Sequence, residues 1–261
     1  MMALSMSEKK RIHRSEFLRM VLGIVLLAVV VGAGYFAYQA IQPSRTAPVS
    51  ITWLGHSSFL VRHGDKIIYL DPYAGEYVDK ADLILVTHSH PDHYNTTKID
   101  RIRKDGTIVI APADVASKIG GPVKTLGPGE RASFGDITVG AVEAYNYKRF
   151  RSPGNPYHPK GFGVGYLLKL GDKTIYHAGD TDFIPEMGDL KNIYLALLPT
   201  GGTFTMDNPE AVEAALAIKP RFVIPMHSRD TDPTEFKKGV ESRSAEVKVI
   251  LPKPGEEFKI E

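Results

Sequence analysis

One short segment constrains this chain more than any other: an apolar run that ends in four side chains able to bind a metal ion. Residues 83–86 read Leu-Ile-Leu-Val and are apolar on both faces, which is typical of a strand buried inside a sheet. The ligand-type side chains that follow are His88, His90, Asp92 and His93. His88 and His90 project to one side of an extended chain, because side-chain direction repeats every two residues. Pro91 suits the first turn of a following helix, so we expect Asp92 and His93 where the chain turns back.

These four side chains predict a metal site. Burying three imidazoles and a carboxylate without partners would cost several kcal/mol, so a purely structural role is disfavoured. The chain contains no cysteine, which excludes thiolate ligands and leaves histidine and carboxylate donors. A chain without cysteine suits an oxidising compartment but does not require one.

The remainder of the chain after residue 50 is predicted to form short strands and helices. Strands are expected at 51–54, 59–62, 67–70, 83–86, 107–111, 137–144, 163–170, 173–177, 194–198, 222–225 and 247–251. Helices are expected at 94–103, 113–119, 208–218 and 233–242, and Asn208-Pro209 and Asp232-Pro233 mark the last two starts. Strands first occur in a run and later alternate with helices, which predicts sheets covered by helices.

The segment His88-Ser89-His90-Pro91-Asp92-His93 matches the H-x-H-x-D-H signature of the metallo-β-lactamase superfamily, and the resemblance continues along nearly all of residues 50–260. Other matching segments follow in order: Trp53 to Phe59, Leu70-Asp71-Pro72, His177 to Thr181, Leu197 to Gly202 with Met206, and Pro225-Met226-His227. Together they are similar to the branch that contains L-ascorbate-6-phosphate lactonase and the phospholipase D acting on N-acyl-phosphatidylethanolamine. The resemblance implies an α/β fold, an αββα sandwich with its site at the strand ends along one edge.

The resemblance also implies two metal ions. His88 and His90 would bind the first, and Asp92 and His93 the second. Asp180, on the turn after strand 173–177, would bridge both ions, and His227, after strand 222–225, would complete the second site.

The chain departs from the family where the first ion usually receives a further histidine. Asn146 stands at that position, and His158 follows in the Pro- and Gly-rich loop 152–161. Either His158 or the carbonyl oxygen of Asn146 could complete the site, and His158 could instead line the entrance. We expect Asp71 to accept the second ring N–H of a metal-bound histidine, or to be a simple turn residue. His56 is expected to support the site, and His177 to point away from it and be structural.

A donor set of nitrogen and oxygen suits zinc best, with manganese or iron as alternatives. Two adjacent ions would hold a hydroxide, because metal binding lowers the pKa of water from ~15.7 to ~7. Asp92 would orient that nucleophile or pass its proton to the leaving group. The chain is therefore expected to be a metal-dependent hydrolase, and a catalytically silent metal-binding module on the membrane is the alternative that Asn146 raises.

The expected substrate is a small-molecule or lipidic ester, lactone or phosphodiester. The loop 147–160 is basic and aromatic and could guide an anion to the metals, although a solvated surface loop has the same composition. A formal net charge of +2 gives no drive towards nucleic acid, so no nucleic-acid partner is expected.

The N-terminal part predicts a membrane helix. Residues 20–42 carry no charge, and ~20 apolar residues span a hydrocarbon core of roughly 30 Å. Five basic residues precede this stretch and only Arg45 follows nearby, which predicts a cytoplasmic N-terminus and an extracytoplasmic catalytic domain. A cleaved signal peptide is the competing interpretation. The predicted organisation is a basic segment at 1–19, a transmembrane helix at 20–42, a linker at 43–49 and the hydrolase domain at 50–261.

Overall fold

The computed structural model describes residues 22–26, 29, 32, 47–229 and 231–260. The chain divides into two units, Met1–Arg45 and Thr46–Glu261. In the first unit, the described residues are helical. Most of the expected transmembrane stretch lies outside the described residues, and within them no helix combines the length and the apolar character needed to cross a bilayer.

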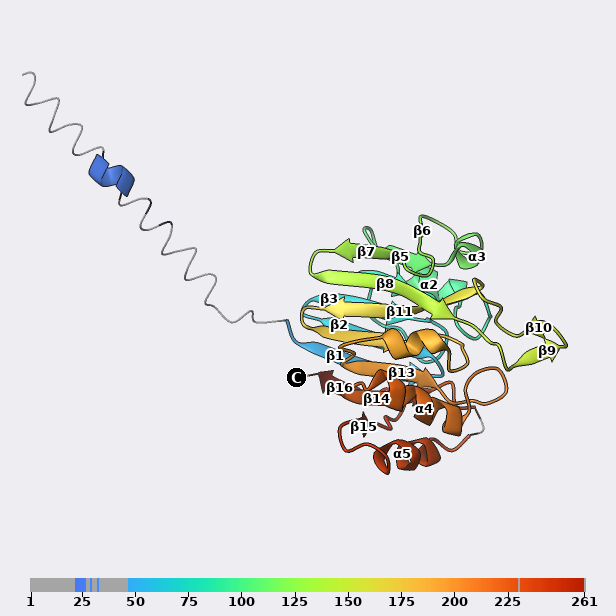
Figure 1. Cartoon of the computed structure of the whole chain (residues 1–261). Coiled ribbons are helices and arrows are strands. Elements are labelled where there is room, and N and C mark those ends of the chain that lie inside the picture. Colours follow the sequence, from blue (N-terminus) through green and yellow to red (C-terminus); the bar gives the residue numbers. More distant parts are fainter. Residues whose placement is uncertain (1–21, 27–28, 30–31, 33–46, 230, 261) are drawn as a thin grey trace, which may run out of the picture. The chain divides into compact units, whose positions relative to one another are not determined.

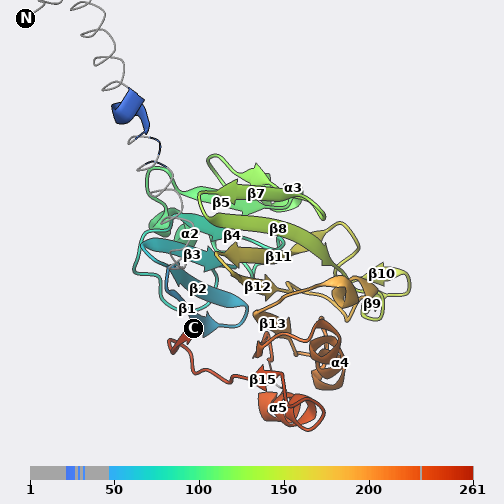
Figure 2. The same cartoon turned by 60° about the vertical axis from the view of Figure 1, so that its left-hand side comes forward.

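Two sheets of seven strands each pack face to face in the second unit (Figures 1 and 2). The first has the order β16 (Glu257–Ile260), β1 (Val49–Gly55), β2 (Ser58–His63), β3 (Lys66–Leu70), β4 (Leu83–Leu85), β5 (Ile108–Ala111) and β6 (Lys124–Thr125). The second has the order β15 (Lys248–Val249), β14 (Phe222–Met226), β13 (Leu195–Pro199), β12 (Lys173–His177), β11 (Gly163–Leu170), β8 (Ile137–Ala144) and β7 (Arg131–Phe134). A hairpin of β9 (Phe150–Ser152) and β10 (Asn155–Pro156) projects from the body (Figure 1).

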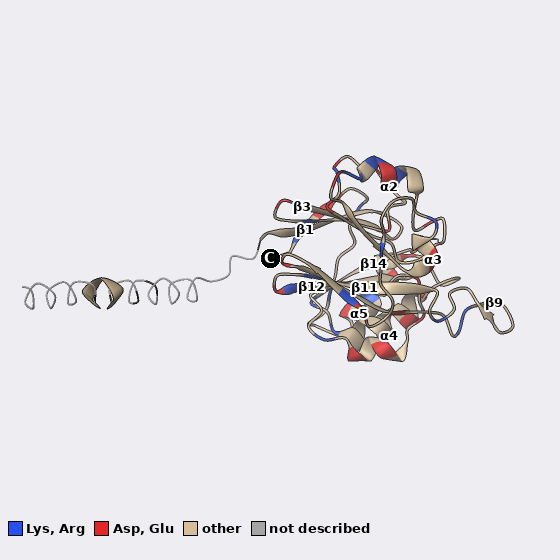
Figure 3. Cartoon of the chain, turned by 90° about the horizontal axis from the view of Figure 1, so that it is seen from above, with Lys and Arg blue, Asp and Glu red and all other residues tan. Residues whose placement is uncertain are grey.

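Helices cover the outer faces of both sheets. The helices α2 (Thr96–Ile102) and α3 (Ala113–Ala116) pack on the first sheet, and α4 (Asn208–Ile218) and α5 (Pro233–Glu241) belong to the second. A short 3-10 helix, η1 (Pro185–Asp189), follows β12. Seen from above, α2 lies beyond one sheet, and α4 and α5 lie beyond the other (Figure 3). The predicted αββα sandwich is therefore confirmed.

Strand β4 shows why the sequence forms this sandwich. Leu83 and Leu85 face the core between the two sheets, whereas Ile84 faces a second core beneath α2 and α3. A strand buried on both faces must be apolar at every position, as predicted for this run. The strand ends at Leu85, one residue before the predicted end.

Most predicted elements are present with small differences at their ends. The bounds 137–144, 163–170, 173–177 and 208–218 are those observed. The strand at 247–251 shortens to β15, the helix at 113–119 shortens to α3, and β1 begins at Val49 inside the predicted linker. Strands β6, β7, β9, β10 and β16, and η1, were not predicted because they are short or contain many polar residues.

The expectation that Pro91 opens a helix is wrong. Residues 91–93 form a turn closed by a hydrogen bond from the His93 N–H to the His90 carbonyl, 3.0 Å. The helix α2 begins only at Thr96, because the Asn95 side chain accepts a hydrogen bond from the Lys98 N–H and caps it.

One edge of the sandwich collects the loops that carry the site. Strands β3, β4 and β5 are parallel neighbours in the first sheet, and β12, β13 and β14 are parallel neighbours in the second. The carboxyl ends of parallel strands lie at the same edge of a sheet, which is where ligands bind in such sheets. The predicted site residues directly follow β3, β4, β12 and β14.

Candidate metal centre

Three histidines form a first cluster at this edge. The Nε2 atom of His88 lies 3.1 Å from Nδ1 of His90, and Nε2 of His158 lies 3.0 Å from the same Nδ1 atom. His88 and His158 are buried, and His90 is half-buried. The first cluster therefore directs one ring nitrogen from each of three imidazoles at a common point.

A second cluster consists of His56, Asp92, His93 and His227, whose donor atoms all lie within 4.8 Å of one another. The Oδ2 atom of Asp92 lies 3.3 Å from Nε2 of His56 and 3.8 Å from Nε2 of His227. The sequence predicts only a supporting role for His56. Its position within the second cluster makes it a possible ligand as well.

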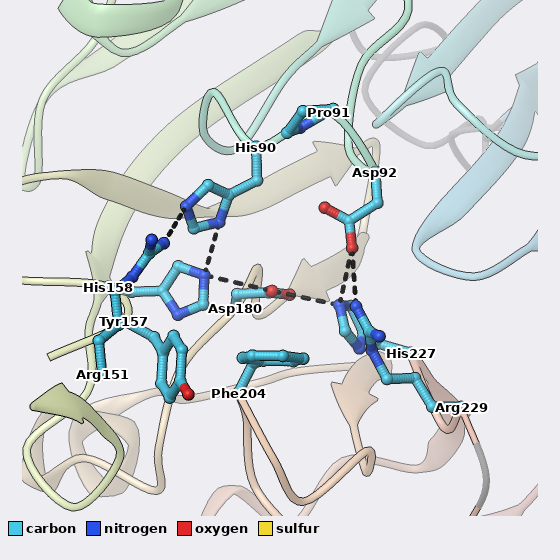
Figure 4. A pocket seen from close by; sticks show the side chains of 10 residues that line it. All are labelled: His90, Pro91, Asp92, Arg151, Tyr157, His158, Asp180, Phe204, His227 and Arg229. Carbon is cyan, nitrogen blue, oxygen red and sulfur yellow. Dashed lines mark hydrogen bonds and ion pairs between the residues drawn. The ribbon is translucent and has the colours of Figure 1, made fainter.

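Asp180 lies between the two clusters (Figure 4). Its Oδ1 atom is 3.2 Å from Nε2 of His93. Its Oδ2 atom is 3.2 Å from Nε2 of His227 and 3.4 Å from Nε2 of His158. One buried carboxylate thus reaches both groups, which is the arrangement that the predicted bridging role requires.

Five buried atoms of the centre make no hydrogen bond within the described part of the chain: Nε2 of His56, Nε2 of His93, both ring nitrogens of His227 and Oδ1 of Asp180. Each such atom costs roughly 1–3 kcal/mol when left unsatisfied. Cations held by the two clusters would satisfy Nε2 of His93, Nε2 of His227 and Oδ1 of Asp180. The nitrogen and oxygen donors present therefore fit divalent ions, and zinc in particular.

The histidines of the first cluster are in the state that metal binding needs. Burial, followed by the positive charges of neighbouring histidines, holds the pKa of His88 well below its usual value. Burial also lowers the pKa of His158 to about 4 and lowers the pKa of His90. Neutral imidazoles have a free ring nitrogen for a cation, so this environment favours ligation.

The carboxylates are held ionised. Burial alone would raise the pKa of Asp180, but the neighbouring His227 and His93 lower it well below its usual value. Burial likewise opposes ionisation of Asp92, yet the close contact with His56, at 3.3 Å, and the charge of His93 lower its pKa. Asp92 also pairs with Arg229, 3.1 Å from guanidinium nitrogen to carboxylate oxygen. Both aspartates are therefore acceptors rather than proton donors at neutral pH.

Asp71 orients His93 from behind. This fully buried carboxylate accepts hydrogen bonds from the backbone N–H and the hydroxyl of Thr87, each at 2.7 Å. It also lies 2.8 Å from Nδ1 of His93. This contact keeps a proton on Nδ1 and turns Nε2 towards Asp180, so Nε2 would be the ligand atom of a metal-bound His93. The predicted contact between Asp71 and a ring N–H is thus present.

Asn146 holds His158 instead of reaching the first cluster. Its Oδ1 atom accepts from the backbone N–H of His158 at 3.0 Å and lies 2.7 Å from Nδ1 of the same residue. Its amide nitrogen donates to Oδ1 of the fully buried Asp182, 3.0 Å away. Of the two candidates for the vacant family position, the geometry therefore favours His158.

His177 stands apart from both clusters, as predicted. Its Nε2 donates to the Ser57 carbonyl at 2.9 Å, and its Nδ1 accepts from the Gly179 N–H at 3.2 Å. Both ring nitrogens are occupied, so His177 connects the two sheets behind the centre.

Left-handed backbone conformations gather at this edge. Among the described residues, six non-glycine residues have positive φ, and four of them belong to the site: His56 (51°), Asp71 (43°), His227 (50°) and Arg229 (47°). Each costs on the order of 1–3 kcal/mol and persists only where the surroundings impose it. Sequence patterns carry no signal for such strain in non-glycine residues.

A pocket of about 250 Å³ opens over the centre. Its lining includes Arg151, Tyr157, Phe204 and Arg229 in addition to the ligand-type residues (Figure 4). Arg151 and Tyr157 lie in the basic and aromatic loop that the sequence singled out. Phe204 and Arg229 were missed, since a single aromatic or basic residue in a loop gives no signal until the fold places it.

Comparison with known proteins identifies the relatives of this chain. A model of the Beta-lactamase superfamily domain matches residues 50–227. A UPF0173 metal-dependent hydrolase of Thermococcus kodakarensis is 36% identical over 233 residues, covering 81% of this chain and 100% of that protein. The corresponding protein of Pyrococcus furiosus is 37% identical with the same coverage.

Solved structures agree. A metallo hydrolase from Ignicoccus hospitalis superposes with a TM-score of 0.69 and 28% identity, over 82% of this chain and 99% of that chain. A proposed metal-dependent hydrolase from Parabacteroides distasonis gives a TM-score of 0.73 and 34% identity, over 78% of this chain and 92% of that chain. Because the domain model covers most of the chain and the relatives match along their whole length, this chain belongs to the metallo-β-lactamase superfamily and, within it, to the UPF0173 metal-dependent hydrolases.

Proposed function

We propose that this chain is a dinuclear metal hydrolase that cleaves an ester, lactone or phosphodiester bond. The observation that carries the proposal is the position of Asp180, one buried carboxylate shared by two groups of nitrogen and oxygen donors. A structural cluster would satisfy its own polar atoms, whereas this one leaves five of them without hydrogen bonds in the described part of the chain.

Each ion would have its own residues. His88, His90 and His158 would hold the first ion, Asp92, His93 and His227 would hold the second, and Asp180 would contact both. Zinc suits these donors best, with manganese or iron as alternatives. Two such ions would supply a water activated near neutral pH and a Lewis acid for the substrate oxygen.

The residues of the chain then control protons and position. The lowered pKa of Asp92 favours its ionised form, and as an acceptor it would orient the attacking water or pass the water's proton to the leaving oxygen as the scissile bond breaks. Asp71 and Asn146 hold the rings of His93 and His158, which fixes where attack occurs. Within the superfamily, the order of the motifs supports a branch close to the ascorbate-6-phosphate lactonase and the N-acyl-phosphatidylethanolamine phospholipase D.

Metal analysis followed by a substrate screen tests this proposal. The full chain, purified and loaded with Zn²⁺, is expected to hold about two ions and to hydrolyse at least one of a phosphodiester, a lactone and a phospholipid. His90→Ala is expected to reduce turnover by roughly 100-fold or more, as loss of a metal ligand does. His13→Ala, in the basic N-terminal segment and outside the proposed ligand set, is the matched control. Metal uptake without turnover on any class would favour the silent module, and turnover of only β-lactams or thioesters would reject the substrate classes named.

We also propose that the hydrolase domain is tethered outside the cytoplasm. The support is the uncharged stretch 20–42 with basic residues before it. Because the chain has no cysteine, single cysteines can report the topology. Lys259→Cys, at an exposed position of β16, is expected to react with a membrane-impermeant maleimide on intact cells, and Ser7→Cys is not. The opposite labelling pattern would reject this orientation.

A further inference from the structure

The second ring nitrogen of His90 faces a donor instead of an acceptor. Its Nδ1 atom points at the first cluster, 3.1 Å from Nε2 of His88. Its Nε2 atom lies 3.1 Å from a terminal guanidinium nitrogen of Arg151 (Figure 4). Metal-binding histidines normally give their other ring N–H to a carboxylate, a carbonyl or a water. No such acceptor is found for His90 among the described residues.

This contact conflicts with metal binding unless a further group is present. A neutral imidazole has one nitrogen with a free lone pair and one that carries a proton. If Nδ1 of His90 binds the first ion, Nε2 must be an N–H donor. The guanidinium of Arg151 has donors only. Two donors then face the same space, and an acceptor atom between them would satisfy both.

Arg151 is also an unneutralised charge at the mouth of the pocket. The other pocket arginine, Arg229, pairs with Asp92. In the part of the chain that the structure describes, no carboxylate lies within ion-pair distance of Arg151, whose guanidinium instead lies over the ring of Tyr157 at 5.4 Å. An anionic group here would therefore accept the hydrogen bond from His90 and also neutralise the charge of Arg151.

One wall of the pocket is aromatic. The rings of Tyr157 and Phe204 meet edge to face with centroids 4.7 Å apart, and both line the pocket opposite His90 (Figure 4). Aromatic walls of this kind accept a planar or aliphatic group next to a few polar anchors.

We propose that the pocket selects phosphodiesters with one apolar substituent, whose charged non-bridging oxygen accepts hydrogen bonds from both Arg151 and the Nε2–H of His90. A phosphodiester carries its negative charge on the reacting phosphorus, and Arg151 is only one imidazole ring away from the first cluster. A neutral ester has no charge there, and a phosphate at the far end of a substrate would not reach. The proposal rests on the metal-binding role proposed above, and it deepens that role by naming the substrate class.

The test compares two ligands of similar shape, one charged and one neutral. Methyl(phenyl)phosphinate is a monoanion without a hydrolysable P–O–C bond, and dimethyl(phenyl)phosphine oxide carries a methyl group in place of its charged oxygen. Binding to the full-length, zinc-loaded chain is measured by titration calorimetry after metal content has been determined. Arg151→Gln is expected to weaken binding of the monoanion roughly 10- to 100-fold, since it removes a charge-assisted hydrogen bond, and to leave the neutral ligand unchanged.

Variants keep the result interpretable. Arg151 lies on the exposed hairpin and makes no ion pair in the described residues, so its loss should not unfold the chain. Arg151→Lys keeps the charge but lacks the planar set of guanidinium N–H donors, so its affinity for the monoanion is expected to lie between those of Arg151→Gln and the parent. Arg131→Gln, an exposed arginine of β7 outside the pocket, is the matched control and should bind like the parent.

The outcomes separate this proposal from the one before it. Zinc uptake and hydrolysis with equal monoanion binding in Arg151→Gln and the parent would overturn the phosphodiester proposal alone. An equal decrease in affinity for both ligands would also overturn it, since Arg151 would then determine the shape of the pocket instead of binding the negative charge. A chain that takes up no zinc would overturn both. Turnover of methyl 4-nitrophenyl phosphate but not of phosphatidylethanolamine vesicles would identify a soluble substrate, and the reverse would identify a lipid. Arg151→Gln is expected to lower whichever turnover the parent shows.

Discussion

Asn146→Ala tests whether the hydrogen bonds of Asn146 hold His158 in place of the histidine that the family usually supplies. Asn146 makes three hydrogen bonds, two to His158 and one to Asp182, at 2.7–3.0 Å, and its side chain is buried. At about 0.5–1.5 kcal/mol each, their loss amounts to roughly 2–4 kcal/mol. Part of this appears as lower stability, and part as a weaker first metal site because the His158 ring is no longer held.

Two assays separate those parts. Thermal or denaturant unfolding of chelator-treated protein gives the change in stability without metal. Competition with a chromophoric chelator gives the affinity for each Zn²⁺, and a 10- to 100-fold weakening of one ion is expected when a residue that orients a ligand is removed. Asn155→Ala, an exposed asparagine in the same loop, is the matched control and should change neither quantity.

His158→Ala sets the scale for interpretation. It is expected to abolish binding of one ion, whereas Asn146→Ala only weakens it. If Asn146→Ala removes the ion as completely as His158→Ala does, Asn146 is itself the ligand. If Asn146→Ala binds both ions with parental affinity, the orienting role is refuted.

Two further substitutions test residues that contact the metal-binding histidines from behind. Asp71→Asn should lower the free energy of unfolding of the metal-free chain by roughly 2–4 kcal/mol in denaturant titration, because a buried charged acceptor of three hydrogen bonds is lost; an unchanged midpoint would contradict this. Gly163→Ala would place a Cβ 2.8 Å from the Cβ of His88, so we expect about 1–3 kcal/mol of destabilisation and weaker zinc binding. Gly188→Ala, with no atom within 4 Å of its added Cβ, should do neither, and equal behaviour of the two variants would refute the packing argument.

The fold was predictable where burial leaves a strong pattern. Strand β4 is apolar at every position because it is covered on both faces, and β11 and β12 have the predicted bounds for similar reasons. The edge strand β16 escaped prediction because four residues with two exposed charges, Glu257 and Lys259, carry little hydrophobic pattern. Its strand conformation follows from pairing with β1, more than 200 residues earlier, and such long-range pairing leaves no local trace.

The residues of the candidate site were predictable, whereas their hydrogen bonds and ring orientations were much less so. Ligand-type residues after buried strands can be found from spacing, and His88, His90, Asp92 and His93 lie where that spacing suggests. Which nitrogen of each ring faces inward depends on second-layer partners such as Asp71 and Asn146, and these partners come from distant loops.

Residues with a left-handed backbone conformation could not be predicted from the sequence. His227 at φ 50° follows a buried strand directly, and an imidazole there gives no hint that the backbone reverses. The surroundings impose the conformation: a Cβ on Gly201 would lie 2.3 Å from the His227 carbonyl oxygen, so only glycine admits this turn so close to the neighbouring loop. The strain at His227 and the small residue at position 201 are therefore one feature, in which close packing of two loops turns the imidazole of His227 towards Asp180.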